Sequence, residues 1–446
     1  FMQRTGQAGG LVFALTFASG CTPADEATVP AARELASVAP NVYVNIRNDG
    51  IVEIYCHRSE MGQGIRTSLP QVIADELEAD WDKIKLLQAI GHEKYGDQNT
   101  DGSTSIRKHF DLLRNAGATA RDMMIAAAAS MWGVPADECV AREHAVHHAA
   151  SGQSAGYGDL VDAASELPQP ESAEFKSPDD YKYIGKPMDT IDGMAFTTGA
   201  AVYATDMTLP DMLYASIERC PALGGTVASL DDTAARAVAG VVDVVRMPEP
   251  TTPPLFNVLG GVAVIATNSW AAEKGRKALD IEWDLGTNAV YSSDSYKEQL
   301  IASASAPGNA VLSRGDADVA AASVHEAIYY APHLAQAPME PPAATAKVNA
   351  DGTCEVWACT QDPQTARGTV AATLGLEPEQ VTVNVTLLGG GFGRKSKPDF
   401  IAEAAWLARE AGKPVKVQWT REDDIRHGYF HSVSAQYFRA GMDEDG

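Results

Sequence analysis

The stretch Val381-Thr-Val-Asn-Val-Thr-Leu-Leu-Gly-Gly-Gly-Phe-Gly-Arg-Lys395 runs from an alternating apolar pattern directly into four glycines grouped around one aromatic residue. Its valines recur at every second position, which predicts a strand with one buried face. Glycines at such a place let the backbone approach a ligand closely, and the amides of a loop before a helix attract anions. Phe392 would then form a rigid wall. The stretch predicts a binding loop, with a flexible glycine connection as the alternative.

A second polar loop lies upstream, where Thr360-Gln-Asp-Pro-Gln364 ends one predicted strand and opens another helix. Asp362 is suited to cap that helix, Pro363 to occupy its first position and Gly375 to end it. Gln361 is therefore expected at the junction of a strand and a helix.

The order of strand, glycine loop and helix recurs near the N-terminus. Asn48-Asp-Gly50 predicts a hairpin whose second strand leads into Glu60-Met-Gly-Gln-Gly64, and apolar residues at helical spacing follow over 69–77. Further along, Gly102-Ser-Thr-Ser105 precedes a long helix expected from about Ile106. Its amides and hydroxyls favour an anion, with simple helix capping as the alternative.

Four segments together resemble the molybdenum-binding subunits of the xanthine dehydrogenase and aldehyde oxidase family. They are Met61-Gly-Gln-Gly64, the segment from His333 to Pro342, Gln361 and the glycine loop at 389–393. In most of that family the Met-Gly-Gln-Gly segment follows the glycine loop, whereas here it precedes the loop. This permuted order resembles the branch of isoquinoline 1-oxidoreductase beta subunits, exported aldehyde dehydrogenases and nicotinate dehydrogenases.

The resemblance implies a molybdopterin cytosine dinucleotide whose molybdenum is held by the pterin dithiolene rather than by protein side chains. It makes Gln361, as a hydrogen-bond donor near the metal, and Phe392, beside the substrate channel, the candidate catalytic residues. The cofactor-binding residues that it implies are Gly62, Gln63, Gly64, Gly102, Ser103, Thr104, Ser105, Gln361, Gly390, Gly391, Phe392, Gly393 and Arg394.

The chain departs from the family pattern in two places. Many relatives have a Glu that orients substrate where this chain has Ser396, which disfavours purine-like substrates. The family's general base is a Glu in a C-terminal Gly-x-Gly-Glu-like segment, and no Gly-Glu dipeptide occurs in these 446 residues. We therefore expect the base to lie outside this chain, in a C-terminal remainder of the large subunit. Glu340 is a candidate supporting carboxylate, with an ordinary buried or capping carboxylate as the alternative.

The expected fold class is α+β, because strand and helix units repeat irregularly along the chain. The resemblance adds molybdopterin-binding subdomains of aldehyde oxidase type that flank an α/β hammerhead domain. The expected boundaries are an export-signal-like segment at 1–21, a permuted molybdopterin-binding subdomain at 40–165, the hammerhead domain at 180–285, a linker at 286–320 and a second, incomplete molybdopterin-binding subdomain at 321–446.

Composition limits the partners. The net charge of -24 disfavours nucleic acid and anionic membrane surfaces. The 6 cysteines show no Cys-x-x-Cys and no ferredoxin spacing, so no iron–sulfur cluster is expected in this chain. His144, His147 and His148 lack cysteine partners, which disfavours a zinc site. The resemblance supplies a small [2Fe-2S] subunit as the electron acceptor, often followed by a cytochrome c subunit.

Residues 9–20 form an apolar run that is short for a membrane span but typical of an export signal. The end of this run, together with the next residue, reads Ala18-Ser-Gly-Cys21 and resembles a lipoprotein cleavage box. Related proteins carry a twin-arginine leader. A periplasmic, membrane-associated location is therefore expected, with an internal helix as the alternative reading of the run.

The leading functional hypothesis is the molybdenum-cofactor subunit of an exported hydroxylase. Its substrate would be a small aldehyde or N-heteroaromatic compound, with water as the oxygen source. One alternative is a catalytically silent exported scaffold that keeps the cofactor fold. Another is a nucleotide-binding enzyme that uses the glycine loop for phosphate, although the loop lacks a Gly-Lys-Ser/Thr ending and a dinucleotide fingerprint.

Overall fold

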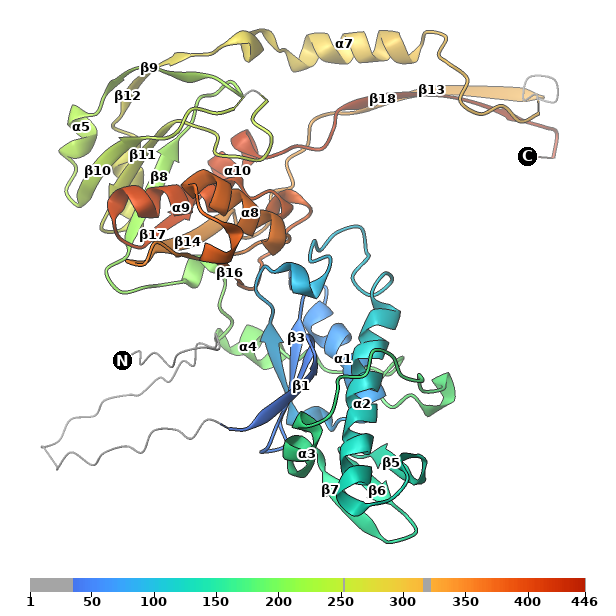
Figure 1. The fold of residues 1–446 in the computed structure, drawn as a ribbon. Helices are drawn as coiled ribbons and strands as arrows, with labels where there is room; N and C mark the ends of the chain where they lie inside the picture. Colours follow the sequence, from blue (N-terminus) through green and yellow to red (C-terminus); the bar gives the residue numbers. More distant parts are fainter. Residues whose placement is uncertain (1–34, 252, 316–321, 446) are drawn as a thin grey trace, which may run out of the picture. The chain divides into compact units, whose positions relative to one another are not determined.

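The computed structural model describes residues 35–251, 253–315 and 322–445, and Figure 1 traces their helices and strands. The export-signal-like segment expected at 1–21, including Cys21, lies outside these residues. Within the described ranges, no helix is both long and apolar enough to cross a bilayer.

The N-terminal part contains a four-stranded sheet in the order β1-β2-β3-β4. β1 (Ser37–Asn41), β2 (Val44–Arg47) and β3 (Val52–Cys56) are antiparallel, whereas β4 (Ile84–Gln88) runs parallel to β3. The hairpin expected at residues 48–50 joins β2 to β3 and is confirmed. Helix α1 (Ile65–Leu77) connects the parallel pair, which confirms the expected strand, glycine loop and helix.

Helix α2 (Phe110–Trp132) packs closely on α1. A Cβ on Gly117 would lie 2.7 Å from the Cβ of Glu76, so a larger residue there would push the helices apart. The helix expected from Ile106 was placed one turn too early. Beyond α2 lie β5 (Cys139–Arg142), β6 (Ala145–His148), β7 (Gln153–Gly156) and α3 (Val161–Ser165), and the three strands form a sheet in that order.

Two helices end in the same way, and the sequence predicted one of these ends, at Gly375. α2 ends at Gly133 and α8 (Pro363–Leu374) ends at Gly375, and both glycines have a left-handed φ of 66°. A short 3-10 turn then leads from each glycine into a strand, β5 in one case and β16 (Val381–Val385) in the other. The same succession of helix, glycine, 3-10 turn and strand therefore occurs twice within the described residues.

A seven-stranded sheet has the order β10-β11-β8-β17-β14-β15-β16. Its remaining members are β8 (Leu213–Glu218), β10 (Val241–Arg246), β11 (Val262–Ala266), β14 (Ala343–Val348), β15 (Cys354–Ala358) and β17 (Val415–Gln418). β8 and β17 pair in parallel, so strands from the expected 180–285 and 321–446 domains share one sheet. Only β9 (Thr226–Asp231) and β12 (Asp280–Asp284), among the strands of 180–285, form a separate pair. The boundary expected at residue 285 therefore does not coincide with a break in the larger sheet.

The short helices α5 (Thr233–Arg236) and α6 (Ser269–Arg276) pack on strands of this sheet, α4 (Gly193–Thr198) precedes β8 in the chain, and α10 (Arg421–His427) follows β17. α9 (Asp399–Ala411) buries Phe400 and Leu407 in the core that also contains Val383 of β16. This packing fixes the helix that follows the second glycine loop.

The expected linker at 286–320 includes a helix, α7 (Ser293–Ala304). β13 (Ser323–Ala331) then pairs with β18 (Ser434–Met442) as an antiparallel ribbon, visible in Figure 1.

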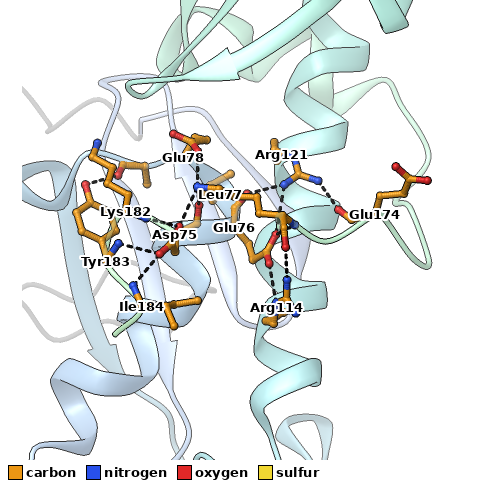
Figure 2. Close-up of polar contacts among 12 residues, drawn as sticks. Asp75, Glu76, Leu77, Glu78, Arg114, Arg121, Glu174, Lys182, Tyr183 and Ile184 are labelled. Carbon is orange, nitrogen blue, oxygen red and sulfur yellow. Dashed lines mark hydrogen bonds and ion pairs between the residues drawn. The ribbon is translucent and has the colours of Figure 1, made fainter. Parts of the chain in front are cut away.

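The segment after α3 is fixed along α1 by two buried carboxylates, shown in Figure 2. Asp75 accepts hydrogen bonds from the N–H groups of Tyr183 at 2.8 Å and Ile184 at 2.7 Å. Its neighbour Glu76 accepts from the N–H of Lys176 in the same segment at 3.0 Å, and it also pairs with Arg114 at 2.7 Å and Arg121 at 3.3 Å of α2. Buried carboxylates keep their charge only with such partners, so this contact between segment and helix is specific.

Candidate functional site

Gln361 lies just beyond β15 and before α8, and it is 2% exposed. Its Nε2 donates to the carbonyl oxygen of Thr100 at 2.8 Å, and its Oε1 accepts from the N–H of Gly393 at 3.0 Å. The N–H of Thr100 donates in return to the carbonyl of Gln361 at 2.9 Å. One amide side chain therefore joins the loop after β4, the strand–helix junction and the second glycine loop, and Nε2 still carries a second N–H.

The two glycine loops meet at Gly391. A Cβ on this residue would lie 2.9 Å from the Sδ of Met61 and would overlap the side-chain amide of Gln361. The loops are also joined directly, because the N–H of Leu388 donates to the carbonyl of Glu60 at 2.9 Å. The structure thus brings together Gln361 and the two glycine-containing segments that the sequence singled out. Their roles in binding a ligand stay predictions.

The first glycine loop is already occupied by a carboxylate from its own segment. Glu60 is 3% exposed, and its Oε1 accepts from the N–H groups of Gly62 at 2.8 Å and Gly64 at 3.0 Å. Its Oε2 accepts from the N–H of Arg66 at 3.1 Å, at the start of α1. Gln63 is engaged as well, since its Oε1 accepts from the N–H of Met61 at 2.7 Å. Glu60 therefore already occupies the amides of Gly62, Gly64 and Arg66 at this helix start.

The second glycine loop is held at both ends and open in the middle. The N–H of Gly389 donates to the Oε2 of Glu340 at 3.0 Å, and that of Gly393 donates to Gln361. Within the described ranges, the N–H groups of Gly390, Gly391 and Phe392 have no acceptor. Three successive N–H groups without a protein partner are a suitable place for an electronegative atom of a ligand.

Phe392 has a φ of 53° and is 66% exposed. An aromatic residue with left-handed φ is strained, and such strain is typical of binding sites. Its ring faces away from the core, so a wall formed by Phe392 would contact a bound ligand rather than close a preformed cavity.

Arg394 was expected to bind the cofactor, and its placement contradicts that role for the side chain. The guanidinium forms two hydrogen bonds of 2.8 Å to Asp399, and both side chains are fully buried. The cation also lies 4.8 Å from the ring centroid of Trp419. Arg394 therefore stabilises the start of α9. The sequence could not distinguish this ion pair from ligand binding, because both uses suit an Arg near a glycine loop.

The loop at 102–105 does not open a helix. Gly102 and Ser103 have φ of 53° and 56°, and turns continue to residue 109 before α2 begins. Residues 105–109 form hydrogen-bonded turns rather than a continuous helix, so the expected helix start at Ile106 is wrong and α2 begins at Phe110. The Oγ1 of Thr104 donates to the carbonyl of Asp101 at 2.8 Å, so this hydroxyl stabilises the turn. Ser105, the fourth residue of that set, is half-buried in the same turns. The loop still lies next to the site, because Thr100 bonds to Gln361.

The histidines at the predicted hairpin of β5 and β6 have individual structural partners. A ring nitrogen of His144 lies 2.7 Å from the carbonyl of Gly50, and one of His148 lies 3.0 Å from Glu138. The Nε2 of His147 lies 3.3 Å from the carbonyl of Arg142. In the described part of the chain, no cluster of three or more metal-ligating side chains is present.

Two residues of the site were missed at the level of sequence. Thr100 lies in a polar run without a recognisable motif, and its backbone rather than its side chain contacts Gln361. Glu60 was visible as an acidic residue just before a helix start, which is a position where carboxylates favour the free N–H groups. That signal could have predicted that the loop satisfies its own amides.

Comparison with known proteins points to one cofactor. A family model described as a molybdopterin cofactor-binding domain matches residues 301–446, and a second model of the same description matches residues 9–207. Isoquinoline 1-oxidoreductase subunit beta of Brevundimonas diminuta is 32% identical over 490 residues, which cover 96% of this chain and 60% of that protein.

The membrane-bound aldehyde dehydrogenase of Gluconacetobacter polyoxogenes, whose name includes pyrroloquinoline quinone, is also 32% identical. That match covers 91% of this chain and 53% of that protein, so the chain spans little more than half the length of these relatives. Among solved structures, the aldehyde oxidoreductase of Desulfovibrio desulfuricans has a TM-score of 0.46 at 18% identity, over 65% of this chain and 37% of that chain.

Proposed function

This chain belongs to the molybdopterin-binding subunits of the xanthine dehydrogenase and aldehyde oxidase family, and we propose that it holds a molybdopterin cytosine dinucleotide where its two glycine loops meet. The observation that carries the proposal is the cluster at Gly391. There the N–H groups of residues 390–392 have no acceptor among the described residues, and a Cβ on Gly391 would clash with the side chains of Gln361 and Met61. A cradle that a single Cβ would fill suits a cofactor held by backbone amides.

The bound group supplies the redox chemistry, because molybdenum accepts two electrons while an oxygen atom from water reaches the substrate. The residues of this chain bind and orient the cofactor and the substrate. Gln361 is held at both ends of its amide and therefore presents its remaining N–H in a fixed direction. Phe392 offers an exposed ring beside the open amides, which suits an apolar wall for a flat or small substrate.

Neither of the carboxylates at the two loops, Glu60 or Glu340, is suited to accept the proton of this reaction. Glu60 accepts three backbone hydrogen bonds, and Glu340 accepts from Gly389, from Thr205 and from the ammonium of Lys395. A carboxylate whose oxygens are committed to three donors is poorly placed to take a proton from a reacting group. We propose that the general base is a Glu of a further segment of the large subunit.

The electron exit is proposed to be a separate [2Fe-2S] subunit, with a cytochrome c subunit beyond it. Burial raises the pKa of the Cys56 thiol to about 11 and those of Cys354 and Cys359 to about 12. Such thiols stay protonated at neutral pH, whereas cluster ligands are thiolates. Relatives are named as beta or large subunits, which supports an assembly of several chains.

The substrate class we propose is a small aldehyde or an N-heteroaromatic compound. The names of the similar proteins include isoquinoline, aldehyde and nicotinate. We also propose a periplasmic, membrane-associated location after twin-arginine export, which rests on the apolar run at residues 9–20. Fractionation of cells that express the native gene tests the location.

The experiment that tests the function starts with the chain purified together with its natural partners. Molybdenum is measured by mass spectrometry, and the nucleotide released by acid is identified by chromatography. We expect about one molybdenum and one cytidine monophosphate per chain. Purified, active material without molybdenum would disprove the proposal.

A silent scaffold is the second candidate, favoured by the absence of an uncommitted carboxylate at the loops. The two candidate functions predict different responses when further polypeptides are added to the purified chain. For the enzyme, adding the proposed further segment of the large subunit gives reduction of molybdenum by substrate in one turnover, and adding the iron–sulfur subunit gives steady turnover. A scaffold binds the cofactor but shows neither response.

A further inference from the structure

Two buried glutamates each hold one glycine loop. Glu60 binds three N–H groups of the first loop with one carboxylate. Glu340 binds the N–H of Gly389 with its carboxylate, while its own N–H donates to the carbonyl of Gly389 at 2.9 Å. Both side chains are more than nine-tenths buried.

The carboxylates also connect the loops to the rest of the site. The carbonyl of Glu60 accepts from Leu388, the residue before the second loop. Glu340 reaches the far side of that loop, because its Oε2 lies 2.9 Å from the Nζ of Lys395, and the carbonyl of Lys395 accepts from the N–H of Gln361. A change at either glutamate would therefore move Gly391 or Gln361.

We infer that Glu60 and Glu340 are positioning residues for the cofactor, which together set the distance between the two glycine loops. The inference rests on the proposed function and gives it a finer form. The anionic and electronegative parts of the cofactor meet the open N–H groups of residues 390–392, whereas the amides of Gly62 and Gly64 remain bound to Glu60 in the loaded protein. Loss of the charge at residue 60 should therefore loosen the cofactor without removing any group that contacts it.

Glu60→Gln is the main test, because it keeps the size of the side chain and removes the charge. The carboxamide has one oxygen acceptor, and its NH₂ group would face a backbone donor. Glu76→Gln is the matched control. Glu76 lies on the adjoining helix α1, is also fully buried and also binds several donors, but those donors are Arg114 and Arg121 of α2 (Figure 2) and the N–H of Lys176.

Two measurements distinguish a role of Glu60 in positioning the first loop from a general contribution to the stability of the fold. The first is amide hydrogen exchange of the cofactor-free chain, in which Glu60→Gln should accelerate exchange of the peptide that contains residues 61–66, and Glu76→Gln should not. The second is the rate at which the loaded complex releases molybdenum and nucleotide during dialysis. Weakening one charge-assisted hydrogen bond corresponds to about tenfold faster release, and we expect at least this change for Glu60→Gln, with the rate of Glu76→Gln unchanged despite a lower melting temperature.

Glu340→Gln should accelerate exchange at residues 388–393 and release of the cofactor to a similar extent. If Glu60→Gln does not fold, Glu60→Asp provides the same measurements, because the shorter carboxylate cannot reach all three donors. Release at the wild-type rate in folded Glu60 and Glu340 variants would overturn the inference, as would slower release, since that would mean the cofactor displaces Glu60 from its amides. A wild-type complex without molybdenum would instead refute the proposed function, and the exchange data would still report whether Glu60 holds its loop.

Discussion

The two glycine loops share a local plan, and they differ in what occupies their amide groups. Each follows a strand, β3 or β16, and each precedes a helix, α1 or α9. In the first loop the acceptor is Glu60, which immediately precedes Met61-Gly-Gln-Gly64, so a local turn satisfies the N–H groups. In the second loop the acceptor is Glu340, which is remote in sequence and reaches only Gly389. A glycine loop before a helix is therefore not an anion site by itself, because an internal carboxylate can close it.

The connection to the following helix differs too. α1 begins directly after Gly64, whereas a 3-10 turn at Arg394–Ser396 separates the second loop from α9. That turn directs Arg394 and Lys395 into the core, where each pairs with a carboxylate. The second loop stays open in its middle because buried ion pairs on its C-terminal side, rather than its own residues, hold it in place.

The largest effect on stability should come from Lys395→Met. The Nζ of Lys395 is fully buried and lies 2.9 Å from the Oε2 of Glu340. Removing one partner of a buried pair leaves the other charge uncompensated, which costs about 3–5 kcal/mol of unfolding free energy. Urea denaturation measures the change. Lys277→Met is the control, because its pair with Glu273 is exposed and should contribute less than about 0.5 kcal/mol. Equal effects of the two variants would mean that the second loop does not depend on its buried pair.

Gln361→Ala should lower turnover by about a hundredfold or more, which corresponds to ~3 kcal/mol for one oriented donor at a reacting centre. The variant also leaves the N–H of Gly393 and the carbonyl of Thr100 without their partner, so some loss of stability accompanies the loss of activity. Steady-state kinetics of the complete complex measures kcat and KM. An unchanged kcat would place Gln361 outside the reacting centre and leave it as a link between loops.

Replacing one glycine of each loop with alanine compares the two loops most directly. Gly391→Ala places a Cβ against the buried amide of Gln361 and the sulfur of Met61. We expect a cost of about 1–3 kcal/mol in stability and a loss of activity, because Gln361 must move. Gly62→Ala meets nothing within 4 Å but has a φ of 104°, so it should lower stability without changing kcat.

A double replacement, Gly391→Ala with Gln361→Ala, extends this test. If the alanine at 391 acts by displacing Gln361, the second change should add little to the loss of kcat. Additive losses would show that Gly391 contributes through its own N–H or through Met61.

Local signals in the sequence predicted the elements of the fold well. Asn48-Asp-Gly50 predicted the hairpin between β2 and β3, and Asp362, Pro363 and Gly375 predicted the start and the end of α8. These signals act through bonds between residues close in sequence, so they can be recognised without a structure.

Long-range pairing and the direction of charged side chains could not be predicted in the same way. β8 and β17 are adjacent in one sheet, although no pattern in either strand specifies the other. Arg394 fits a ligand site and a buried pair with Asp399 equally well on residue type alone. The partner that a charged side chain binds depends on which donors or acceptors the folded chain brings near it. Glu60 shows this even though its partners are close to it in sequence.

The smallest expected effect is a pH dependence of stability that comes from His57, in the segment between β3 and the first loop. β3 leads into that loop through His57, whose pKa is lowered from 6.5 to about 3, first by burial and then by the nearby His109 and Arg58, while Asp97 acts in the opposite direction. Within the described residues neither ring nitrogen of His57 has a hydrogen-bond partner. β16 leads into the second loop through Thr386, Leu387 and Leu388, which do not titrate.

Because the folded protein keeps His57 neutral while the unfolded chain takes up a proton below pH 6.5, the unfolded state binds more protons in this range. The contribution of His57 to stability is therefore complete above pH 6.5 and is lost as the pH falls from 6.5 towards about 3. Between pH 7 and pH 6 the loss amounts to on the order of 1 kcal/mol or less. His57→Phe keeps a ring that can pack edge-on against Tyr43 and His109, and it should reduce the difference in unfolding free energy between the two pH values. Urea denaturation of both proteins at pH 7 and pH 6 measures this difference. An identical pH dependence would mean that His57 gains a partner or a proton in the folded protein, and that the first loop is no more sensitive to acid than the second.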